Sequence, residues 1–476
     1  MKKIHLLTFL SLFFLIGCKK DKTPPNVILI ITDDQGYGDL NFNGNPNIKT
    51  PALDKFANES VRFNNFYVSP VCAPTRSSLM TGRYSLRTGV RDTYNGGAIM
   101  ASSEVTLAEM LKQANFTTGI FGKWHLGTLT KDILDANRGG KKENDIHYAP
   151  PWDNGFDVSF VTESKVPTWD PMITPPNTAE DVKATLSEGA PFGTYYWKGA
   201  GQPVTKNISG DDSRVIMDRV IPFIEESVAQ NQPFLSIIWF HAPHLPVLTG
   251  DQYKSVYADL SEDKQNYYGV ISALDEQVGR LRDQLKSLGL AHNTLIFYTS
   301  DNGPETSKEV RGQNIPHGRA QGITKGLRGR KRSLLEGGIR VPVIFEWTAK
   351  IPSGTRVEVP CFTSDYFPTI AHILGIDIKK YQRPYDGENL MPYWNKKKQK
   401  RSKPLAFQYN NQFALIDNDI KLYNFSHTGL QLFDLGKDAG EENDLSSLQP
   451  ERLKALQSVY RDWNLSVQNS DAGGDY

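Results

Sequence analysis

Short apolar runs alternate with helical patterns along the chain. Val27–Ile31, Leu235–Phe240 and Leu295–Tyr298 are continuous runs of β-branched, leucine and aromatic residues, and Val341–Phe345 is a weaker fourth run. Such runs are typical of strands that are covered on both faces. Because helical patterns separate them, we predict an α/β fold in which helices sandwich a large, mixed or mostly parallel sheet.

Two of the helices between these runs have clear sequence signals. Thr106–Glu109 has the pattern of a capping box and is predicted to open a helix. That helix would bury Leu107, Met110 and Leu111. A second helix is predicted to be long and to pack on the sheet, because five apolar residues recur at helical spacing: Val270, Leu274, Val278, Leu281 and Leu285.

The segment from Thr128 to Gly210 is rich in Pro, Gly and Asn, and we predict long loops over a cleft. It contains Trp152, Trp169, Tyr195, Tyr196 and Trp197. Two interpretations stay open for these rings: platforms for sugar rings, or packing of the loops onto the domain.

Beyond Ile376, the stretch 384–403 is predicted to link a smaller C-terminal unit. We therefore divide the mature chain into a catalytic domain at 26–380 and an α+β subdomain with an antiparallel sheet at 381–476. The subdomain is expected to contain short strands and a final helix, at Leu405–Tyr409, Phe413–Ile416, Lys421–Tyr423 and Glu451–Trp463.

The N-terminus has the pattern of an export signal. Lys2 and Lys3 precede an apolar stretch, which ends in Leu15-Ile16-Gly17-Cys18. This ending resembles the lipobox of bacterial lipoproteins. We expect residues 1–17 to be removed as a signal peptide, Cys18 to be lipidated, and 18–25 to form a tether. The protein would then be exported and attached to a bacterial membrane by lipid alone, in the periplasm or at the cell surface. The alternative is an ordinary secretory peptide with an incidental cysteine.

Composition is typical of a soluble globular protein, with 39% hydrophobic and 22% charged residues. A formal net charge of +1 gives no indication of nucleic-acid binding or of electrostatic membrane binding. Apart from Cys18, the only cysteines are Cys72 and Cys361, so the fold does not depend on a disulfide framework. These two thiols could still pair.

Polar side chains follow three of the predicted strands. Asp33-Asp34 follows the first, His241 to His244 the second, and Asp301-Asn302 the third. Ligands of open α/β sheets bind beyond the carboxyl ends of the strands, so these residues could converge on one cleft. Adjacent aspartates inside a strand would point to opposite faces, so both are expected beyond the strand end. Each pair taken alone is also a common turn sequence.

The string Cys72-Ala73-Pro74-Thr75-Arg76 continues as Ser77-Ser78-Leu79-Met80-Thr81-Gly82. Its pattern predicts a helix that starts at Cys72 and stops at Gly82, and a helix N-terminus favours anions. The whole string resembles the signature of the formylglycine-dependent type I sulfatases, a family of the alkaline-phosphatase-like superfamily. The resemblance therefore implies that superfamily's fold and the hydrolysis of sulfate esters.

In that family the signature cysteine is oxidised before folding to formylglycine (3-oxoalanine). For Cys72 this implies a maturation partner, either a formylglycine-generating or an anaerobic sulfatase-maturating enzyme. The hydrated aldehyde is a diol, and one of its oxygens attacks sulfur to give a covalent sulfo-enzyme. Deprotonation of the second hydroxyl then expels sulfate and regenerates the aldehyde.

The resemblance also implies roles for the other motif residues. Asp33, Asp34, Asp301 and Asn302, together with modified Cys72, match the metal ligands. Oxygen donors of this kind favour calcium (Ca²⁺) first and magnesium second, and argue against zinc. Arg76 should hold the diol and the metal-site carboxylates in place.

Four further residues are expected to bind sulfate: Lys123, His125, His244 and Lys331. Lys123 and His125 lie in Gly122-Lys123-Trp124-His125-Leu126-Gly127, and residues two apart in extended chain share a face. His125 would also contact the diol, and His244 would assist the leaving oxygen, whereas His241 is treated as structural. The alternative for Lys331 is a solvated charge in the basic run Arg328–Arg332.

The predicted substrate is a sulfated polysaccharide or its oligosaccharides, with an algal polymer such as ulvan or carrageenan placed ahead of a glycosaminoglycan. A phosphatase or phosphonate monoester hydrolase of the same superfamily is the nearest alternative. Two-zinc phosphatases of that fold typically have Asp-His where this chain has Asp301-Asn302. A catalytically inactive, glycan-binding surface lipoprotein is the alternative from another class, but no catalytic position of the family is missing.

Overall fold

The structure is a computed structural model of the chain. It describes residues 23–475 apart from 94–96, 98, 177–185, 306–307, 311–312 and 316–317. The predicted signal peptide and the predicted lipidation site at Cys18 lie outside the described residues. In the described part of the chain, no helix combines the length and the apolar character needed to cross a bilayer.

Ten of the described strands form one mixed sheet in the order β13-β2-β12-β9-β1-β8-β4-β5-β6-β7. The central strands β9, β1, β8, β4 and β5 are parallel, whereas β12 joins β9 in the antiparallel direction. The predicted mixed, mostly parallel sheet is thereby confirmed. The bounds in sheet order are Arg356–Val357, Val61–Phe63, Val343–Glu346, Thr294–Ser300, Asn26–Thr32, Phe234–Trp239, Thr117–Lys123, Val158–Thr162, Tyr196–Trp197 and Pro203–Val204.

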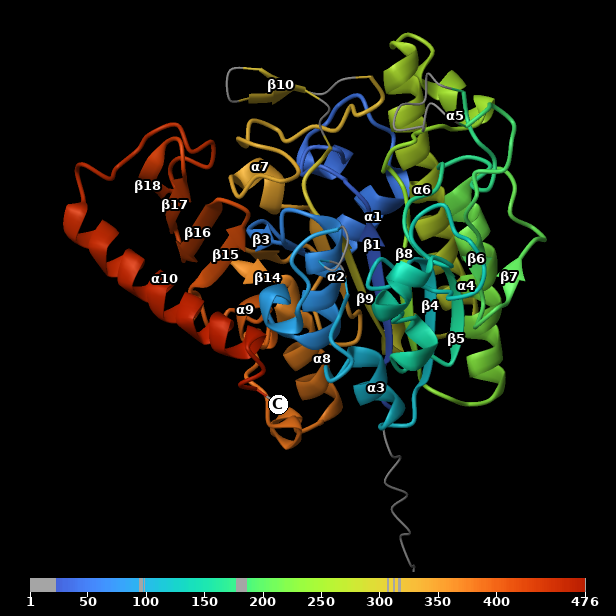
Figure 1. The fold of residues 1–476 in the computed structure, drawn as a ribbon, viewed down its shortest axis with the longest axis horizontal. Helices are drawn as coiled ribbons and strands as arrows, with labels where there is room; N and C mark the ends of the chain where they lie inside the picture. Colours follow the sequence, from blue (N-terminus) through green and yellow to red (C-terminus); the bar gives the residue numbers. More distant parts are fainter. Residues whose placement is uncertain are drawn as a thin grey trace, which may run out of the picture.

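Helices cover both faces of this sheet (Figure 1). Every residue of β1 is buried, and alternate side chains enter different cores. Val27, Leu29 and Ile31 pack with α2, α3 and α8, whereas Ile28 and Ile30 pack with α1, α4 and α6. This two-sided burial explains the uninterrupted apolar run in the sequence. The helices are α1 Pro51–Glu59, α2 Cys72–Thr81, α3 Leu107–Lys112, α4 Asp212–Ala229, α5 Asp251–Lys254, α6 Glu262–Ser287, α7 Glu336–Ile339, α8 Tyr366–Leu374, α9 Met391–Trp394 and α10 Pro450–Asp471.

Both helix predictions are confirmed. Thr106 caps α3: its hydroxyl accepts from the Glu109 backbone N–H, and the Glu109 side chain accepts from the Thr106 N–H. The five apolar residues predicted to share one face of a long helix lie on α6 and are all buried.

The prediction that 128–210 consists of loops is wrong in part. Val158–Thr162 forms β5, which pairs with β4 inside the main sheet, and β6 and β7 extend the same edge. The β-branched and aromatic residues of β5 form a run too short to stand out among the surrounding Pro and Gly. Tyr196 and Trp197 are fully buried on β6, so these two rings pack the domain and are not available to a sugar.

The last part of the chain forms a four-stranded antiparallel sheet covered by α10, seen in orange and red in Figure 1. Its strands are β15 Leu405–Tyr409, β16 Gln412–Asp417, β17 Ile420–Phe425 and β18 Gly429–Asp434. The first three follow the predicted runs, β18 was not predicted, and α10 is longer than expected. One face of the sheet packs against Leu456 of α10, and the other packs against Tyr67 and Tyr84 of the larger unit. The boundary at 380 remains a prediction.

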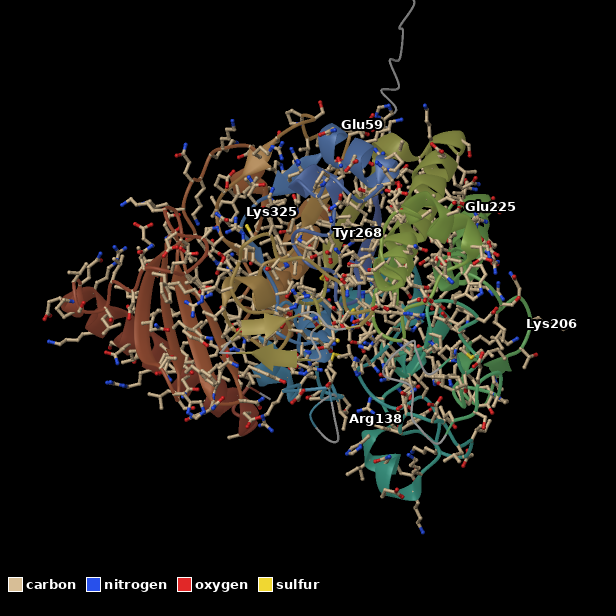
Figure 2. The ribbon with its side chains drawn as sticks, turned by 90° about the horizontal axis from the view of Figure 1, so that it is seen from above. Glu59, Arg138, Lys206, Glu225, Tyr268 and Lys325 are labelled. Atoms are coloured by element: carbon tan, nitrogen blue, oxygen red, sulfur yellow. The ribbon has the colours of Figure 1, made fainter. Side chains whose placement is uncertain are left out.

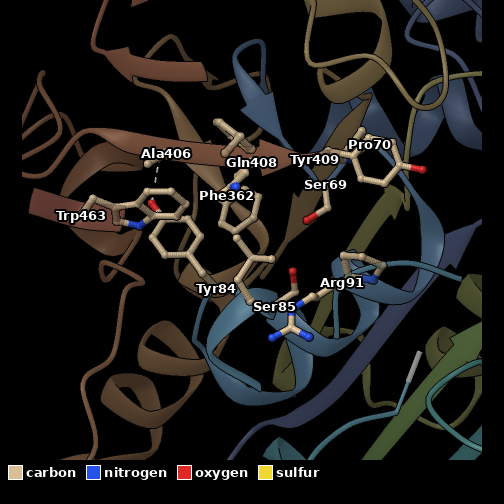
Figure 3. A pocket seen from close by; sticks show the side chains of 13 residues that line it. Ser69, Pro70, Tyr84, Ser85, Arg91, Phe362, Ala406, Gln408, Tyr409 and Trp463 are labelled. Carbon is tan, nitrogen blue, oxygen red and sulfur yellow. Dashed lines mark hydrogen bonds between the residues drawn. The ribbon is translucent and has the colours of Figure 1, made fainter. Parts of the chain in front are cut away.

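The seam between this sheet and the larger unit is closed by aromatic rings (Figure 3). Tyr84 stacks edge-on against Trp463 at 5.3 Å, and its hydroxyl oxygen accepts a hydrogen bond from the Ala406 N–H at 3.1 Å. A cavity of about 20 Å³ remains there, lined also by Phe362 and Tyr409. The segment 384–403 is also packed, because Trp394 of α9 is buried in the main core.

A buried ion pair fixes this segment to the larger unit. Arg401 places Nη1 and Nη2 at 2.7 and 2.8 Å from the two carboxylate oxygens of Asp365, and both side chains are inaccessible or nearly so. The same carboxylate accepts hydrogen bonds from the N–H groups of Phe362 and Glu388.

Removing one partner of this pair should therefore destabilise the fold. We expect Arg401→Met to lower the free energy of unfolding by about 3–5 kcal/mol, because Asp365 would keep a buried, uncompensated charge. Urea denaturation followed by tryptophan fluorescence measures this. Lys397→Met, at an exposed position of the same segment, should stay within about 0.5 kcal/mol of the parent. Equal stabilities for the parent and Arg401→Met would contradict the assignment.

Candidate active site

Helix α2 begins at Cys72 and stops at Gly82, the residue that follows its last residue Thr81, as the sequence predicted. All ten residues of α2 are buried, and Gly82 has φ 70°, the left-handed conformation common after helices. Val71, which precedes the helix, provides no side-chain cap. The Val71 side chain therefore does not satisfy the backbone N–H groups of the first turn, and a helix start of this kind favours an anion.

The polar residues that follow the strands do converge. Strands β1, β9, β8 and β4 lie side by side and are parallel, so their carboxyl ends open onto one region. Asp33 and Asp34 follow β1, Asp301 and Asn302 follow β9, and Lys123 ends β4. Asp34 has φ 65°, which shows that the chain has left the strand and turned, as expected for two adjacent aspartates used together.

One ion network surrounds Asp33. The Lys123 ammonium lies 2.6 Å from its Oδ2, and Arg76 Nη2 lies 3.5 Å from the same oxygen. Arg76 Nη2 is closer still to Asp301, at 2.7 Å from Oδ2. The Cys72 thiol donates to Asp33 Oδ1 at 3.4 Å. Residue 72 thus sits against a carboxylate held between two cations.

A second network surrounds Asp34. Lys331 Nζ lies 2.7 Å from Asp34 Oδ1, and the Asn302 side-chain amide donates to the same oxygen at 2.7 Å. The Asp34 N–H donates to Asp301 Oδ1 at 3.1 Å, which joins the two networks. Lys331 is only 4% exposed, so the solvated-charge alternative for this lysine is wrong.

A backbone contact holds the Lys331 segment in place. Gly303 follows Asn302, and its N–H donates to the Gly338 carbonyl oxygen at 2.9 Å. A Cβ atom at Gly303 would lie 2.0 Å from the Gly337 carbonyl oxygen, so only glycine permits this approach. The Lys331 N–H donates to the Pro304 carbonyl oxygen at 3.1 Å, which fixes the lysine against the same turn.

The two nearby histidines have different surroundings. His244 Nδ1 donates to the Leu245 carbonyl oxygen at 2.5 Å, which leaves Nε2 facing Asp34 at 3.6 Å. His241 instead lies between Asp212, at 2.8 Å, and the Thr162 hydroxyl, at 2.7 Å. With both ring nitrogens engaged in the core, His241 has the structural position that we expected.

His125 lies near Lys123 for a different reason from the one that the sequence spacing suggested. Strand β4 ends at Lys123 and His125 has φ 61°, so the two side chains do not share the face of an extended chain. His125 is instead placed by its N–H, which donates to the Glu163 carbonyl oxygen at 3.1 Å. Burial, and then the charge of nearby Lys123, hold the pKa of the His125 imidazole well below its ordinary value.

Burial and the closely spaced charges of the site shift the pKa values of its ionisable groups. Burial raises the pKa of Asp33, but Lys123 and other cations outweigh burial and hold that pKa well below its ordinary value. Burial and the charge of Asp33 raise the pKa of Asp301 to about 7. Burial, with the charges of Asp301 and Asp33, also raises the pKa of the Cys72 thiol well above its usual range. Burial lowers the pKa of His244 to about 4.

The donor set fits a hard cation. Ligand atoms of Asp33, Asp34, Cys72 and His244 lie within 4.8 Å of one another. Asn302 Oδ1 is buried and has no hydrogen-bond partner among the described residues, which leaves one more oxygen free for a cation. Asp301 adjoins this group with its two oxygens bonded to Asp34 and Arg76. Closely spaced oxygen donors with negative charge are those that calcium and magnesium prefer.

Sequence reasoning missed three neighbours of the site. The ring of Trp239, at the end of β8, lies 4.9 Å from the Arg76 guanidinium. The Thr75 hydroxyl donates to the Asp301 carbonyl oxygen at 2.6 Å, and Glu305 lies 3.2 Å from Lys331 Nζ. Trp239 was expected only as part of a strand and Thr75 only as part of a signature, because nothing in the local pattern indicates these contacts.

Comparisons with known proteins agree with this architecture. The sulfatase family model matches residues 25–376. Steryl-sulfatase of Rattus norvegicus is 29% identical over 438 residues, which cover 82% of this chain and 73% of that protein. N-acetylgalactosamine-6-sulfatase of Mus musculus is 29% identical over 428 residues, covering 87% and 74%.

Among solved structures, Ps i-CgsB in complex with k-i-k-neocarrahexaose matches with a TM-score of 0.78 at 26% identity, covering 93% of each chain. The family model spans well over half of the sequence, and the fold is that of sulfatases of known structure. The chain therefore belongs to the sulfatase family of the alkaline-phosphatase-like superfamily and is a sulfuric ester hydrolase.

Proposed function

We propose that this sulfatase hydrolyses sulfate monoesters of a carbohydrate, with residue 72 as formylglycine and one bound calcium ion. One observation carries the proposal: the side chain of residue 72 lies at a helix N-terminus among Asp33, Lys123 and His244. A sugar substrate is supported by the names of two similar proteins, the N-acetylgalactosamine-6-sulfatase and Ps i-CgsB with its neocarrahexaose ligand. We place an algal polysaccharide ahead of a glycosaminoglycan.

The unmodified thiol is poorly suited to attack sulfur. Cys72 is 1% exposed and its thiol pKa is raised well above the ordinary value, first by burial and then by two carboxylates. A neutral thiol is a weak nucleophile. Formylglycine would supply a hydrated aldehyde with an oxygen nucleophile and a second hydroxyl for release of sulfate.

The surrounding side chains divide the remaining tasks. Lys123 and Lys331 are close enough to residue 72 for their charges to act on its thiol, and their ammonium groups would bind the sulfate oxygens. Arg76 keeps Asp33 and Asp301 in place by charge and hydrogen bonding. His125 would contact both sulfate and residue 72. His244 would give a proton from Nε2 to the leaving sugar oxygen. Because Nδ1 is bonded to Leu245, this requires the doubly protonated ring, which the negative charge of a bound sulfate would favour over the free site, where the pKa is about 4.

Asp33, Asp34, Asp301 and Asn302 would hold the cation, together with modified residue 72. A divalent cation would offset the repulsion between the buried carboxylates and polarise the sulfate. Calcium is proposed first and magnesium second, since the acidic and amide ligands offer oxygen alone. The lipobox that ends at Cys18 supports export and attachment to a membrane through lipid.

The modification is open to direct measurement. We expect peptide mass spectrometry of the chain, made together with a maturation enzyme, to show residue 72 as formylglycine. Cys361 in the same digest serves as the internal control and should remain an unmodified thiol. Cys72→Ala should be inactive. Full activity from protein that contains only the thiol at residue 72 would contradict the proposal.

Metal exchange separates this function from that of a zinc phosphatase. Chelation should abolish turnover, and calcium should restore it better than zinc, because the proposed ligands are hard oxygen donors. Metal analysis should find about one calcium ion per active chain. Recovery with zinc alone, accompanied by hydrolysis of a phosphate monoester, would favour the phosphatase alternative.

Two substitutions distinguish binding of sulfate from protonation of the leaving group. A general acid contributes around 10²–10⁴-fold, and it matters less when the leaving alcohol is already acidic. His244→Ala should therefore reduce kcat/KM far more for a sugar sulfate than for a nitrophenyl sulfate. Lys331→Ala should reduce both by similar factors, because its ammonium contacts sulfate in either case. Equal losses for His244→Ala on the two substrates would leave that histidine as a sulfate contact only.

A further inference from the structure

A buried arginine with unpaired N–H groups lies on the segment between β4 and β5. Arg138, labelled in Figure 2, is 9% exposed, and its Nε lies 3.2 Å from Glu163 Oε1. Its Nη1 and Nη2 are buried and have no hydrogen-bond partner among the residues that the structure describes. Unpaired donors on a buried charge are costly, and native proteins keep few of them without a functional reason.

Other unpaired polar atoms lie on the same segment. Within the described chain, His125 Nδ1, Thr128 Oγ1 and His147 Nδ1 are buried and also have no partner. The Thr128 N–H donates to the His147 carbonyl oxygen at 2.8 Å, so these two residues are neighbours. We call Arg138, His125 and Glu163 the Arg138 cluster; Thr128 and His147 lie on the same segment.

Glu163 joins this cluster to the catalytic region. Its backbone carbonyl oxygen accepts the His125 N–H at 3.1 Å, and its side chain accepts the Gly139 N–H at 3.0 Å and pairs with Arg138. The Arg138 guanidinium is close enough to His125 for its charge to contribute, after burial and Lys123, to the lowered pKa of that imidazole. The cluster therefore adjoins the position proposed for the scissile sulfate.

The guanidinium keeps an excess of positive charge. Glu163 is its only ion-pair partner among the described residues. Burial, and then the charge of Asp135, raise the pKa of Glu163 to about 7, so this carboxylate offsets the guanidinium only in part near neutral pH. With Nε bonded to Glu163, the two Nη groups form a planar fork, which matches the oxygens of a carboxylate or a sulfate.

We propose that the Arg138 cluster binds a second anionic group of the carbohydrate substrate, a carboxylate or a further sulfate close to the scissile ester. This inference rests on the proposed function, because it assigns the site a sugar with at least two negative groups. Arg138 would be a specificity-determining residue: it would bind an oxygen anion that takes no part in bond breaking. Glu163 would position the guanidinium.

A matched set of substrates tests the proposal on the modified, calcium-loaded enzyme. One is a monosulfated sugar, and the others are the same sugar with an added carboxylate or an added second sulfate. Arg138→Gln should reduce kcat/KM for one or both dianionic sugars by roughly 10- to 100-fold, the scale of a charged bidentate contact. It should leave the monosulfated sugar nearly unchanged. The dianionic sugar with the larger loss identifies the group that is bound.

Three further variants separate recognition from folding and from general charge. Arg138→Lys keeps the charge without the planar fork and should recover only part of the loss. The double variant Arg138→Gln/Glu163→Gln removes both buried charges and keeps the comparison possible if the single variant does not fold. Lys131→Gln removes an exposed charge from the same segment and should leave all three substrates unchanged.

Two results would overturn the inference. Equal losses on mono- and dianionic sugars would show that Arg138 acts through the fold or through His125. No loss on any sugar would show that its N–H groups bind nothing in the substrate. Failure of the parent enzyme on every sugar sulfate, with nitrophenyl sulfate still hydrolysed, would instead contradict the proposed carbohydrate function. The activity of the parent enzyme on sugar sulfates therefore tests the proposed carbohydrate function. The ratios of kcat/KM between variant and parent test the role of Arg138.

Discussion

The guanidinium of Arg76 is fully buried, and it lies 2.7 Å from Asp301 and 3.5 Å from Asp33. One positive charge thus links helix α2 to the ends of the two parallel strands β1 and β9. A buried charge of this kind is tolerated only where its partners are held in position. The sheet supplies that rigidity, since β1 and β9 are paired along their whole length and their carboxyl ends cannot move independently.

Two buried lysines of the site are likewise paired with carboxylates. Lys123 is paired with Asp33 and Lys331 with Asp34, so each cation that would meet a sulfate is held by a carboxylate that would hold a metal ion. The residues proposed to bind the metal ion and those proposed to bind sulfate are therefore paired with one another, so the two sites are not independent. A sulfate that enters would meet ammonium groups already ordered by the acidic residues, which reduces the entropy lost on binding.

Much of this arrangement is encoded locally and could be predicted. The uninterrupted runs of β1, β8 and β9, the capping box at Thr106 and the string that begins at Cys72 each determine their structure within a few residues. Other features depend on pairing between distant segments. The ring of Trp239 beneath Arg76, strand β5 within a Pro- and Gly-rich stretch, and the contact of Arg138 with Glu163 leave no periodic signal. His125 shows the limit clearly: its place in the site comes from a bond to the Glu163 backbone, whereas sequence spacing suggested a shared strand face.

Helix α2 has no solvent-facing side, because each of its ten residues is buried. An ordinary surface helix can exchange its polar positions freely, whereas any change in α2 alters either the core or the site. Packing therefore constrains the sequence from Cys72 to Thr81 as much as the chemistry of the site does.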